Sequence, residues 1–207
     1  MNPNQQFWWN WGVACAVAVG TLLTVVTALF GDKLRAYFFP PRLNVRLSRK
    51  EGERIELKDA GGKHAGWSYY YFIHVWNARR WSPAEQTQVS LVRIEQPGPS
   101  GDFHTTWSGD IPIQWRNQSY VPLLRTIGAP AECDFCRVEK TGTLQLLPLL
   151  VPNNLKAEWR GGCKYVAHLQ ARSTYADSPV LRLKVSWDGG WNDGVVEMKR
   201  HMEIEPE

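Results

Sequence analysis

The feature that most constrains this chain is an uncharged segment near its N-terminus. From Trp11 to Phe30 the sequence reads WGVACAVAVGTLLTVVTALF, 20 residues without Asp, Glu, Lys or Arg. A helix of this length covers roughly 30 Å, which is the thickness of the hydrocarbon core of a bilayer. Aromatic residues stand on both sides of the segment, as expected for rings at the two headgroup levels: Phe7, Trp8, Trp9 and Trp11 before it, and Tyr37, Phe38 and Phe39 after it. We expect a transmembrane helix over residues 11–30, after a short N-terminal tail over residues 1–10.

A cleaved signal peptide is the alternative interpretation of the same segment. Signal peptides begin with a positively charged region, whereas the first six residues, MNPNQQ, contain no Lys or Arg. The apolar run is also longer than the apolar region of a typical signal peptide, which has about 7–15 residues. Both observations favour a helix that is retained in the mature protein.

The charges that flank this segment predict its orientation. No basic residue precedes it, and six follow within residues 32–50, where Asp32 is the only acidic residue: Lys33, Arg35, Arg42, Arg46, Arg49 and Lys50. Basic residues stay on the cytoplasmic side of a membrane, where each gains about 1 kcal/mol near anionic lipid. We expect a single-pass protein of the inner (cytoplasmic) membrane with its N-terminus outside. Residues 31–41 would form a basic linker, and its paired prolines would end the helix.

Small residues recur at every fourth position of the apolar segment. Such a row lets two helices approach closely in lipid, and it predicts a partner transmembrane helix or a homo-oligomer. Half of the segment consists of small residues, so a row of this kind also arises without selection for packing. The helix-packing candidates are Gly12, Ala16, Gly20, Thr24 and Ala28.

Beyond the prolines the pattern changes to short strands. The composition is that of a globular protein, with 43% hydrophobic and 21% charged residues. Runs that alternate, or that are rich in β-branched and aromatic residues, lie between Gly, Pro, Asn and Asp. About ten such strands favour a mainly β fold over residues 42–205, a β-sandwich of Ig-like or related topology, rather than a barrel. The predicted strands are 42–48, 53–58, 69–76, 86–95, 111–116, 134–140, 143–149, 163–172, 180–187 and 195–204.

The charge of this domain disfavours one class of partner. Residues 51–207 hold 18 basic and 19 acidic residues, because the basic excess of the chain lies next to the apolar segment. A surface that follows a phosphate backbone needs clustered cations. We therefore expect no nucleic-acid partner.

Residues 77–83, NARRWSP, place two arginines beside a tryptophan between two predicted strands. Asn, Ser and Pro are ordinary turn residues, so the structural interpretation is that this segment turns the chain. Arg79, Arg80 and Trp81 would also suit an anionic ligand or an acidic protein partner, through charge and bidentate hydrogen bonds. Both interpretations remain open.

The whole pattern resembles a group of uncharacterised bacterial proteins that carry a β-sandwich behind one transmembrane segment. The resemblance rests on the N-terminal helix, on YYYFIHVWNARRWSPAEQTQVSLVRIE, on AECDFCRV and on VSWDGGWNDGVVEM, and it covers most of residues 65–204. It implies the fold and a bacterial origin, but no activity.

Four residues have the chemistry of zinc ligands: Cys133, Cys136, Cys163 and His168. Cys163 and His168 are five residues apart, so they would point to opposite faces of one strand, and no glycine follows Cys136 to form a tight knuckle. Structural, reduced thiols explain them better than a metal or a redox centre. Asp188 and Asp193 in DGGWND suggest a cation loop but lack the necessary number of ligands, and a glycine-rich hairpin explains them better.

No nucleophile-elbow or phosphate-binding glycine motif is present, and the five histidines are scattered. We therefore expect no catalytic residues and no cofactor. The leading hypothesis is a non-enzymatic, single-pass membrane protein whose cytosolic β-sandwich binds a protein partner as an accessory or scaffold subunit of a membrane complex. The alternative hypothesis is a ligand-gated membrane effector in bacterial defence, whose β-domain senses a small anionic, nucleotide-like signal.

Overall fold

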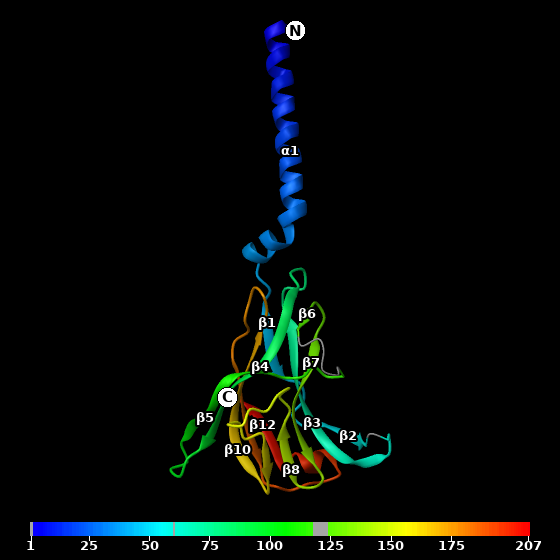
Figure 1. The fold of residues 1–207 in the computed structure, drawn as a ribbon, viewed down its shortest axis with the longest axis vertical. Coiled ribbons are helices and arrows are strands. Elements are labelled where there is room, and N and C mark those ends of the chain that lie inside the picture. The colour runs from blue at the N-terminus through cyan, green and yellow to red at the C-terminus, as the bar shows by residue number, and fades with distance from the viewer. Residues whose placement is uncertain (1, 60, 118–123) are drawn as a thin grey trace. The chain divides into compact units, whose positions relative to one another are not determined.

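The chain forms a long N-terminal helix and a β-domain (Figure 1). In this computed structural model, residues 2–59, 61–117 and 124–207 are described. The chain divides into two compact units, residues 1–40 and 41–207. The fold is mainly β, with two sheets packed together and one apolar helix before them, as the sequence predicts.

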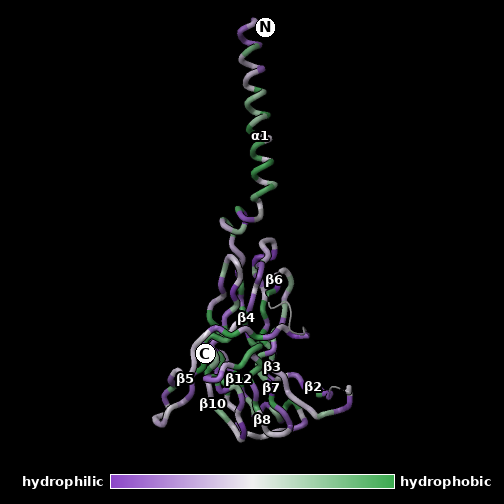
Figure 2. The backbone as a smooth tube through the Cα atoms, viewed as in Figure 1, coloured by the Kyte–Doolittle hydropathy of each residue, from purple (hydrophilic) through white to green (hydrophobic). Residues whose placement is uncertain are grey.

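The helix, α1, spans Pro3–Phe38 and is longer at both ends than the apolar segment that the sequence marks. Pro3 lies in its first turn, where a missing N–H costs nothing, and α1 ends two residues before Pro40. Residues 3–31 are long and apolar enough to cross a membrane, and Figure 2 shows the hydrophobic stretch along the helix. Thr21 and Thr24 donate their hydroxyls to the carbonyls of Val17 and Gly20, at 2.9 and 2.8 Å. These hydroxyls are therefore satisfied within the helix itself.

The described residues of the β-domain form two antiparallel sheets of six strands each. The first sheet has the order β1-β3-β7-β8-β9, with β2 also beside β3: β1 (Leu43–Leu47), β2 (Glu53–Lys58), β3 (His64–Asn77), β7 (Ala131–Glu139), β8 (Thr143–Leu146) and β9 (Glu158–Arg160). The second has the order β12-β11-β10-β4-β5, with β6 beside β4: β4 (Ala84–Pro97), β5 (Phe103–Pro112), β6 (Arg125–Ile127), β10 (Cys163–Arg172), β11 (Leu181–Trp187) and β12 (Met202–Pro206).

The topology is related to that of an immunoglobulin domain. The neighbours β11-β10-β4-β5 correspond to strands G, F, C and C′ of a variable domain, and β1-β3 correspond to A and B. The first sheet then departs from that order. In an immunoglobulin domain strand E lies beside B, and its outer neighbour D comes before it in the chain. Here β7 lies beside β3, and its outer neighbour β8 comes after it in the chain.

The core lies between the inner faces of the two sheets. Tyr69, Tyr71, Ile73 and Val75 alternate along β3 and are fully buried, and alternate residues of β10 and β11 meet them from the second sheet. Each large apolar side chain removed from water contributes about 1.5–3 kcal/mol. Because successive side chains of a strand point to opposite faces, the other side chains of β3 face away from the core.

Two predicted strands are wrong in position. Residues 195–204 form a short helix, α2 (Val195–Met198), before β12 begins at Met202. Val195 and Met198 have helical spacing, and the turn buries Met198. Of the strand expected at 111–116, only residues 111 and 112 belong to β5, which begins at Phe103, and Ile113 and Trp115 form isolated bridges beyond it. The three-residue strands β6 and β9 have no predicted counterpart.

Candidate functional site

A row of aromatic side chains lies on the outer face of the first sheet. Its members alternate with the core residues of β3 and are called the aromatic row: Tyr70, Phe72, His74 and Trp76. Tyr70 and Phe72 are stacked with ring centroids 6.1 Å apart, and the rings of His74 and Trp76 are 5.6 Å apart. Tyr70, His74 and Trp76 are partly exposed and provide contact area on this face, whereas Phe72 is buried.

Three arginines lie against this row, each from a different segment. The guanidinium carbon of Arg116 is 4.0 Å from the centroid of the Phe72 ring, and that of Arg46 is 5.3 Å from the Trp76 ring. Arg137 donates a hydrogen bond of 3.0 Å to the hydroxyl of Tyr70. Cations over aromatic faces contribute about 0.5–1 kcal/mol each at exposed sites. The face therefore combines the two residue types that dominate binding hot spots.

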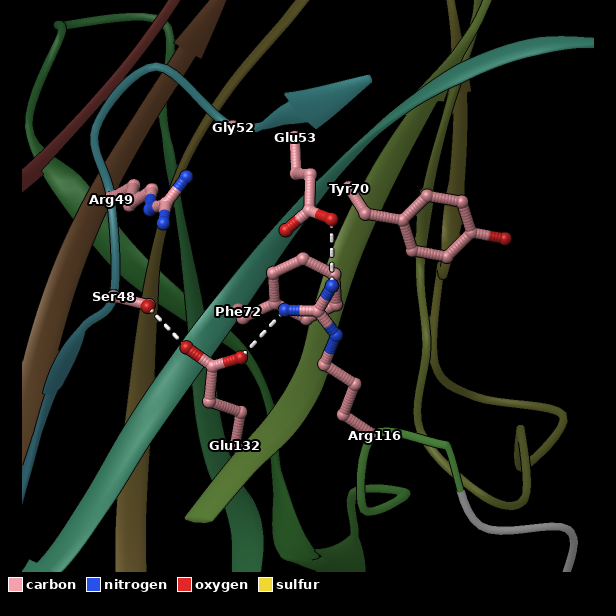
Figure 3. Close-up of a pocket in the computed structure, with 8 residues that line it drawn as sticks. All are labelled: Ser48, Arg49, Gly52, Glu53, Tyr70, Phe72, Arg116 and Glu132. Atoms are coloured by element: carbon pink, nitrogen blue, oxygen red, sulfur yellow. Dashed lines mark hydrogen bonds and ion pairs between the residues drawn. The ribbon is translucent and has the colours of Figure 1, made fainter. Parts of the chain in front are cut away.

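Arg116 is the centre of a small cavity beside the row (Figure 3). Its two terminal nitrogens bind Glu53 and Glu132, both at 2.7 Å, and Ser48 donates to the other oxygen of Glu132 at 2.5 Å. The local backbone fixes these positions: the N–H of Arg116 donates to the carbonyl of Glu132, and that of Ser48 to the carbonyl of Phe72, both at 2.8 Å. Phe72, under the guanidinium, is only 5% exposed.

The charges of this cavity stabilise each other. Burial lowers the pKa of Arg116, but its hydrogen bonds to Glu132 and Glu53 outweigh burial and raise the pKa above its usual value. Burial raises the pKa of Glu132, but the bonds from Ser48 and Arg116 outweigh it and lower the pKa. Ser48 and Arg116 therefore hold Glu132 in its ionised form.

Two titratable groups near the cavity, Asp134 and His74, have shifted pKa values. Burial raises the pKa of Asp134 to about 6, with Glu132 adding to the effect and Arg116 opposing it. Burial, together with the charge of Arg46, lowers the pKa of His74. Neither residue lines the cavity, so we assign them no chemical step there.

Arg49 forms the remaining charged wall of the cavity, and Figure 3 shows its guanidinium on the side opposite Arg116. Among the residues that the structure describes, Arg49 has no hydrogen bond or ion pair. The cavity measures about 90 Å³, far below the roughly 300–1,000 Å³ of a pocket that encloses a small-molecule ligand. It has room for one side chain, and an acidic one would find Arg49 as its donor.

A second hollow at the end of the first sheet is larger but has a different character. It measures about 510 Å³ and is lined only by polar and charged residues. Its charges are paired with each other, Arg137 with Glu139 at 2.8 Å and Arg160 with Glu158 at 3.2 Å. Ligand pockets are mostly apolar with a few converging polar groups, and this hollow lacks the apolar part.

The 78–83 loop is a turn with a fixed backbone. Asn77, only 4% exposed, accepts hydrogen bonds from the N–H groups of Arg42 and Arg79 at 2.9 and 3.0 Å and donates to the carbonyl of Ser82 at 2.6 Å. Arg80 is exposed and Trp81 is 49% exposed. The turn chemistry explains the backbone of this loop, but it does not explain these two outer side chains.

The helix-packing candidates all lie in α1 with exposed side chains. A Cβ atom added at Gly12 or Gly20 would meet no atom of the chain within 4 Å. Ala16, Thr24 and Ala28 continue the same row. The row is therefore accessible to a second helix.

The four candidate zinc ligands are not brought together. Cys133 and Cys136 are buried in the core, because a bulge at Phe135 of β7 brings both cysteines to the inner face. His168 lies on the outer face of the second sheet, 3.1 Å from Glu95. Burial raises the pKa of Cys163 to about 12, and it raises the pKa of Cys133 and of Cys136 well above the usual value. Within the described residues, no group of three or more His, Cys, Asp or Glu is placed to hold a metal ion.

Asp188 and Asp193 are engaged within the protein. Asp188 binds the N–H of Gly190 at 2.7 Å and His201 at 3.0 Å. Asp193 pairs with Arg54 at 2.9 Å and with Lys140 at 3.0 Å. These contacts hold the loop against β2 and the β7–β8 turn, which is a structural role.

The sequence did not reveal the cavity. The residues around it come from three distant segments, and no spacing connects them: Ser48 with Glu53, Arg116, and Glu132. The segment YYYFIHVW was the available signal for the aromatic row, because a strand that buries every second side chain places the remaining side chains on its other face. Comparisons with protein-family models and with curated proteins gave no match for this chain.

Proposed function

We propose that this protein is a single-pass, membrane-anchored and non-enzymatic interaction module, an accessory or scaffold subunit of a complex in a bacterial inner membrane. Its β-domain would be cytoplasmic and would bind a protein partner through the aromatic row and the Arg116 cavity. The carrying observation is this combination of stacked aromatic rings, three arginines and a cavity of side-chain size on the outer face of one sheet.

The helix supports membrane anchoring. Large apolar side chains such as Leu22, Leu23 and Leu29 are more than 60% exposed in the isolated chain. A contiguous apolar surface of this length is not stable in water and needs lipid or a partner helix. The basic residues that follow it favour a cytoplasmic β-domain.

The size of the cavity supports a protein partner rather than a nucleotide-like signal. At about 90 Å³ it excludes a nucleotide, whereas one acidic side chain fits between Arg49 and the Arg116 network. The surrounding row supplies flat aromatic area, on which a partner would exclude water from that ion pair.

The experiment is site-specific photocrosslinking of the full chain in its native membrane. A crosslinking residue at position 49 should give one or a few protein adducts of discrete mass. The matched control is position 184, because Lys184 is exposed on the second sheet. Charge reversal by Arg49→Glu should abolish adducts from a crosslinker at position 70, whereas Lys184→Glu should not.

The same adducts from positions 49 and 184, or none from either, would contradict a partner on this face. Saturable binding of a cyclic nucleotide to the purified full chain at millimolar concentration or below would instead support the effector hypothesis, with Arg79, Arg80 and Trp81 as the first residues to test.

A further inference from the structure

The 78–83 loop lies at the end of the β-domain where the chain enters from α1. We propose that this loop docks on anionic lipid headgroups, with Trp81 at the interface and Arg80 and Arg42 against the phosphates. The inference rests on the proposed function, since it requires a membrane at the end of α1. It adds a second, lipid-bound surface, separate from the aromatic row.

Covalent connectivity restricts where the loop can be. The N–H of Ala78 donates to the carbonyl of Arg42 at 2.8 Å, and the N–H of Arg42 donates to the side chain of Asn77 at 2.9 Å. From Phe38, the last residue of α1, to Arg42 the chain has four steps, which span at most about 14 Å. The base of the loop therefore stays close to the end of α1 in every orientation of the two units.

The last part of α1 has the composition of an interfacial segment. Lys33 and Arg35 are exposed there together with Leu34, Tyr37 and Phe38. Figure 1 shows that the last turns of the helix bend away from the axis of the rest. Tyr and Phe beside Lys and Arg are typical of the headgroup level, so the end of α1 is suited to remain at the membrane surface.

The exposed side chains of the loop match that surface. Trp81 is 49% exposed, and Trp is enriched at membrane interfaces because its ring is both apolar and polar. Arg80 and Arg42 are exposed, and each basic residue gains about 1 kcal/mol near an anionic leaflet. Asn77 already fixes the backbone, so docking orders little additional chain.

A neighbouring loop extends the same end of the domain. Thr174 donates its N–H to the carbonyl of Glu85 at 3.1 Å, which places residues 173–180 beside the start of β4. Tyr175 and Val180 are exposed there. Glu85 and Asp177 are acidic and oppose docking, but Arg42, Arg79 and Arg80 outnumber them.

The experiment measures the solvent exposure of Trp81 directly. The full chain is reconstituted in nanodiscs of phosphatidylcholine alone, or with about one-third phosphatidylglycerol, and is exposed to hydroxyl radicals. Trypsin then releases residues 81–93, WSPAEQTQVSLVR, in which Trp81 is the only aromatic residue. Two arginines at about 1 kcal/mol each favour the docked loop roughly 30-fold, so oxidation of this peptide should fall severalfold in the anionic discs.

Variants identify the source of that protection. Arg80→Ala should weaken docking about fivefold, and the double variant Arg42→Ala with Arg80→Ala should restore the oxidation rate seen in phosphatidylcholine. Arg160→Ala is the matched control, because Arg160 is exposed on β9 at the opposite end of the first sheet. The peptide 185–199, with Trp187 and Trp191, should react equally in both lipids.

The outcomes separate the two proposals. Alkaline carbonate extraction of cell membranes that contain the full chain shows whether α1 is inserted, and a chain that is extracted refutes the membrane anchor itself. An inserted chain whose Trp81 reacts equally in both lipids overturns the lipid-docking inference and leaves the anchor intact. Protection that is independent of lipid charge, or unaffected by the arginine variants, also overturns it.

Discussion

Arg116 holds the candidate site together through four residues that are distant in the sequence. It pairs with Glu53 and Glu132 and covers the ring of Phe72, while Ser48 binds the far oxygen of Glu132. The side chain of Arg116 is about a quarter exposed, so solvent screens these pairs only partly. Its loss would leave two carboxylates close together and uncover an apolar ring.

Arg116→Ala should therefore lower the free energy of unfolding by about 1–3 kcal/mol. Glu132 has a lowered pKa in the folded protein, so its stabilisation is present above its usual value of 4.5 and is lost as the pH falls below that value. Thermal unfolding of the full chain between pH 7 and pH 3 checks both effects. A difference between wild type and variant that does not shrink in acid would contradict this account.

Asp134 provides the opposite test. Burial raises its pKa to about 6 from an ordinary 3.8, so its ionised form destabilises the fold above about pH 6. Asp134→Asn should stabilise the protein by about 1–2 kcal/mol at pH 8, after allowance for partial exposure. The gain should disappear as the pH falls below 4, where the acid is protonated in both states. Equal gain at both pH values would show that ionisation is not the cause.

At the residue scale, the sequence predicts roles where local chemistry decides them. The turn at residues 77–83 follows from its Asn, Ser and Pro, and the structure shows how Asn77 closes it. The Arg116 network does not follow from any local pattern. A guanidinium finds its carboxylates only after β1, β2 and β7 have been placed by the packing of their opposite faces.

At the scale of elements, α1 carries the prediction about assembly. The double variant Ala16→Leu with Gly20→Leu places large side chains in the row of small residues, so two helices can no longer approach closely. It should weaken helix association by about 1–2 kcal/mol, roughly five- to thirty-fold. The matched control is Ala14→Leu with Ala18→Leu, which adds the same side chains on the opposite side of the helix. Sedimentation of the detergent-solubilised full chain measures both. Equal behaviour of the two variants would remove the row from the interface.

The predicted strands show which elements a sequence determines. β3 and β10 alternate strongly because each buries one face over many residues. The prediction for β10 has the observed bounds, whereas the predicted strand 69–76 misses the first five residues of β3. β6 and β9 have three residues each and exist because long neighbours offer them hydrogen bonds. Residues 195–198 are part of a predicted strand, but burial of Met198 favours one helical turn.

At the scale of the whole molecule, charge and hydropathy divide the chain into parts with different environments. The apolar helix carries no charge over 20 residues, six basic residues follow it, and the rest is nearly neutral. We propose that these parts lie in lipid, at the cytoplasmic membrane surface and in the cytosol, respectively. Both the aromatic row and the 78–83 loop act as proposed only if that assignment is correct.

Protease accessibility of the β-domain tests this assignment most directly. In intact spheroplasts of the native cell, a protease added outside should leave residues 41–207 uncut, and in inside-out vesicles it should remove them, with α1 retained in the membrane after carbonate extraction. Loss of the β-domain from intact spheroplasts, or a mature chain that begins after Phe30, would contradict the account.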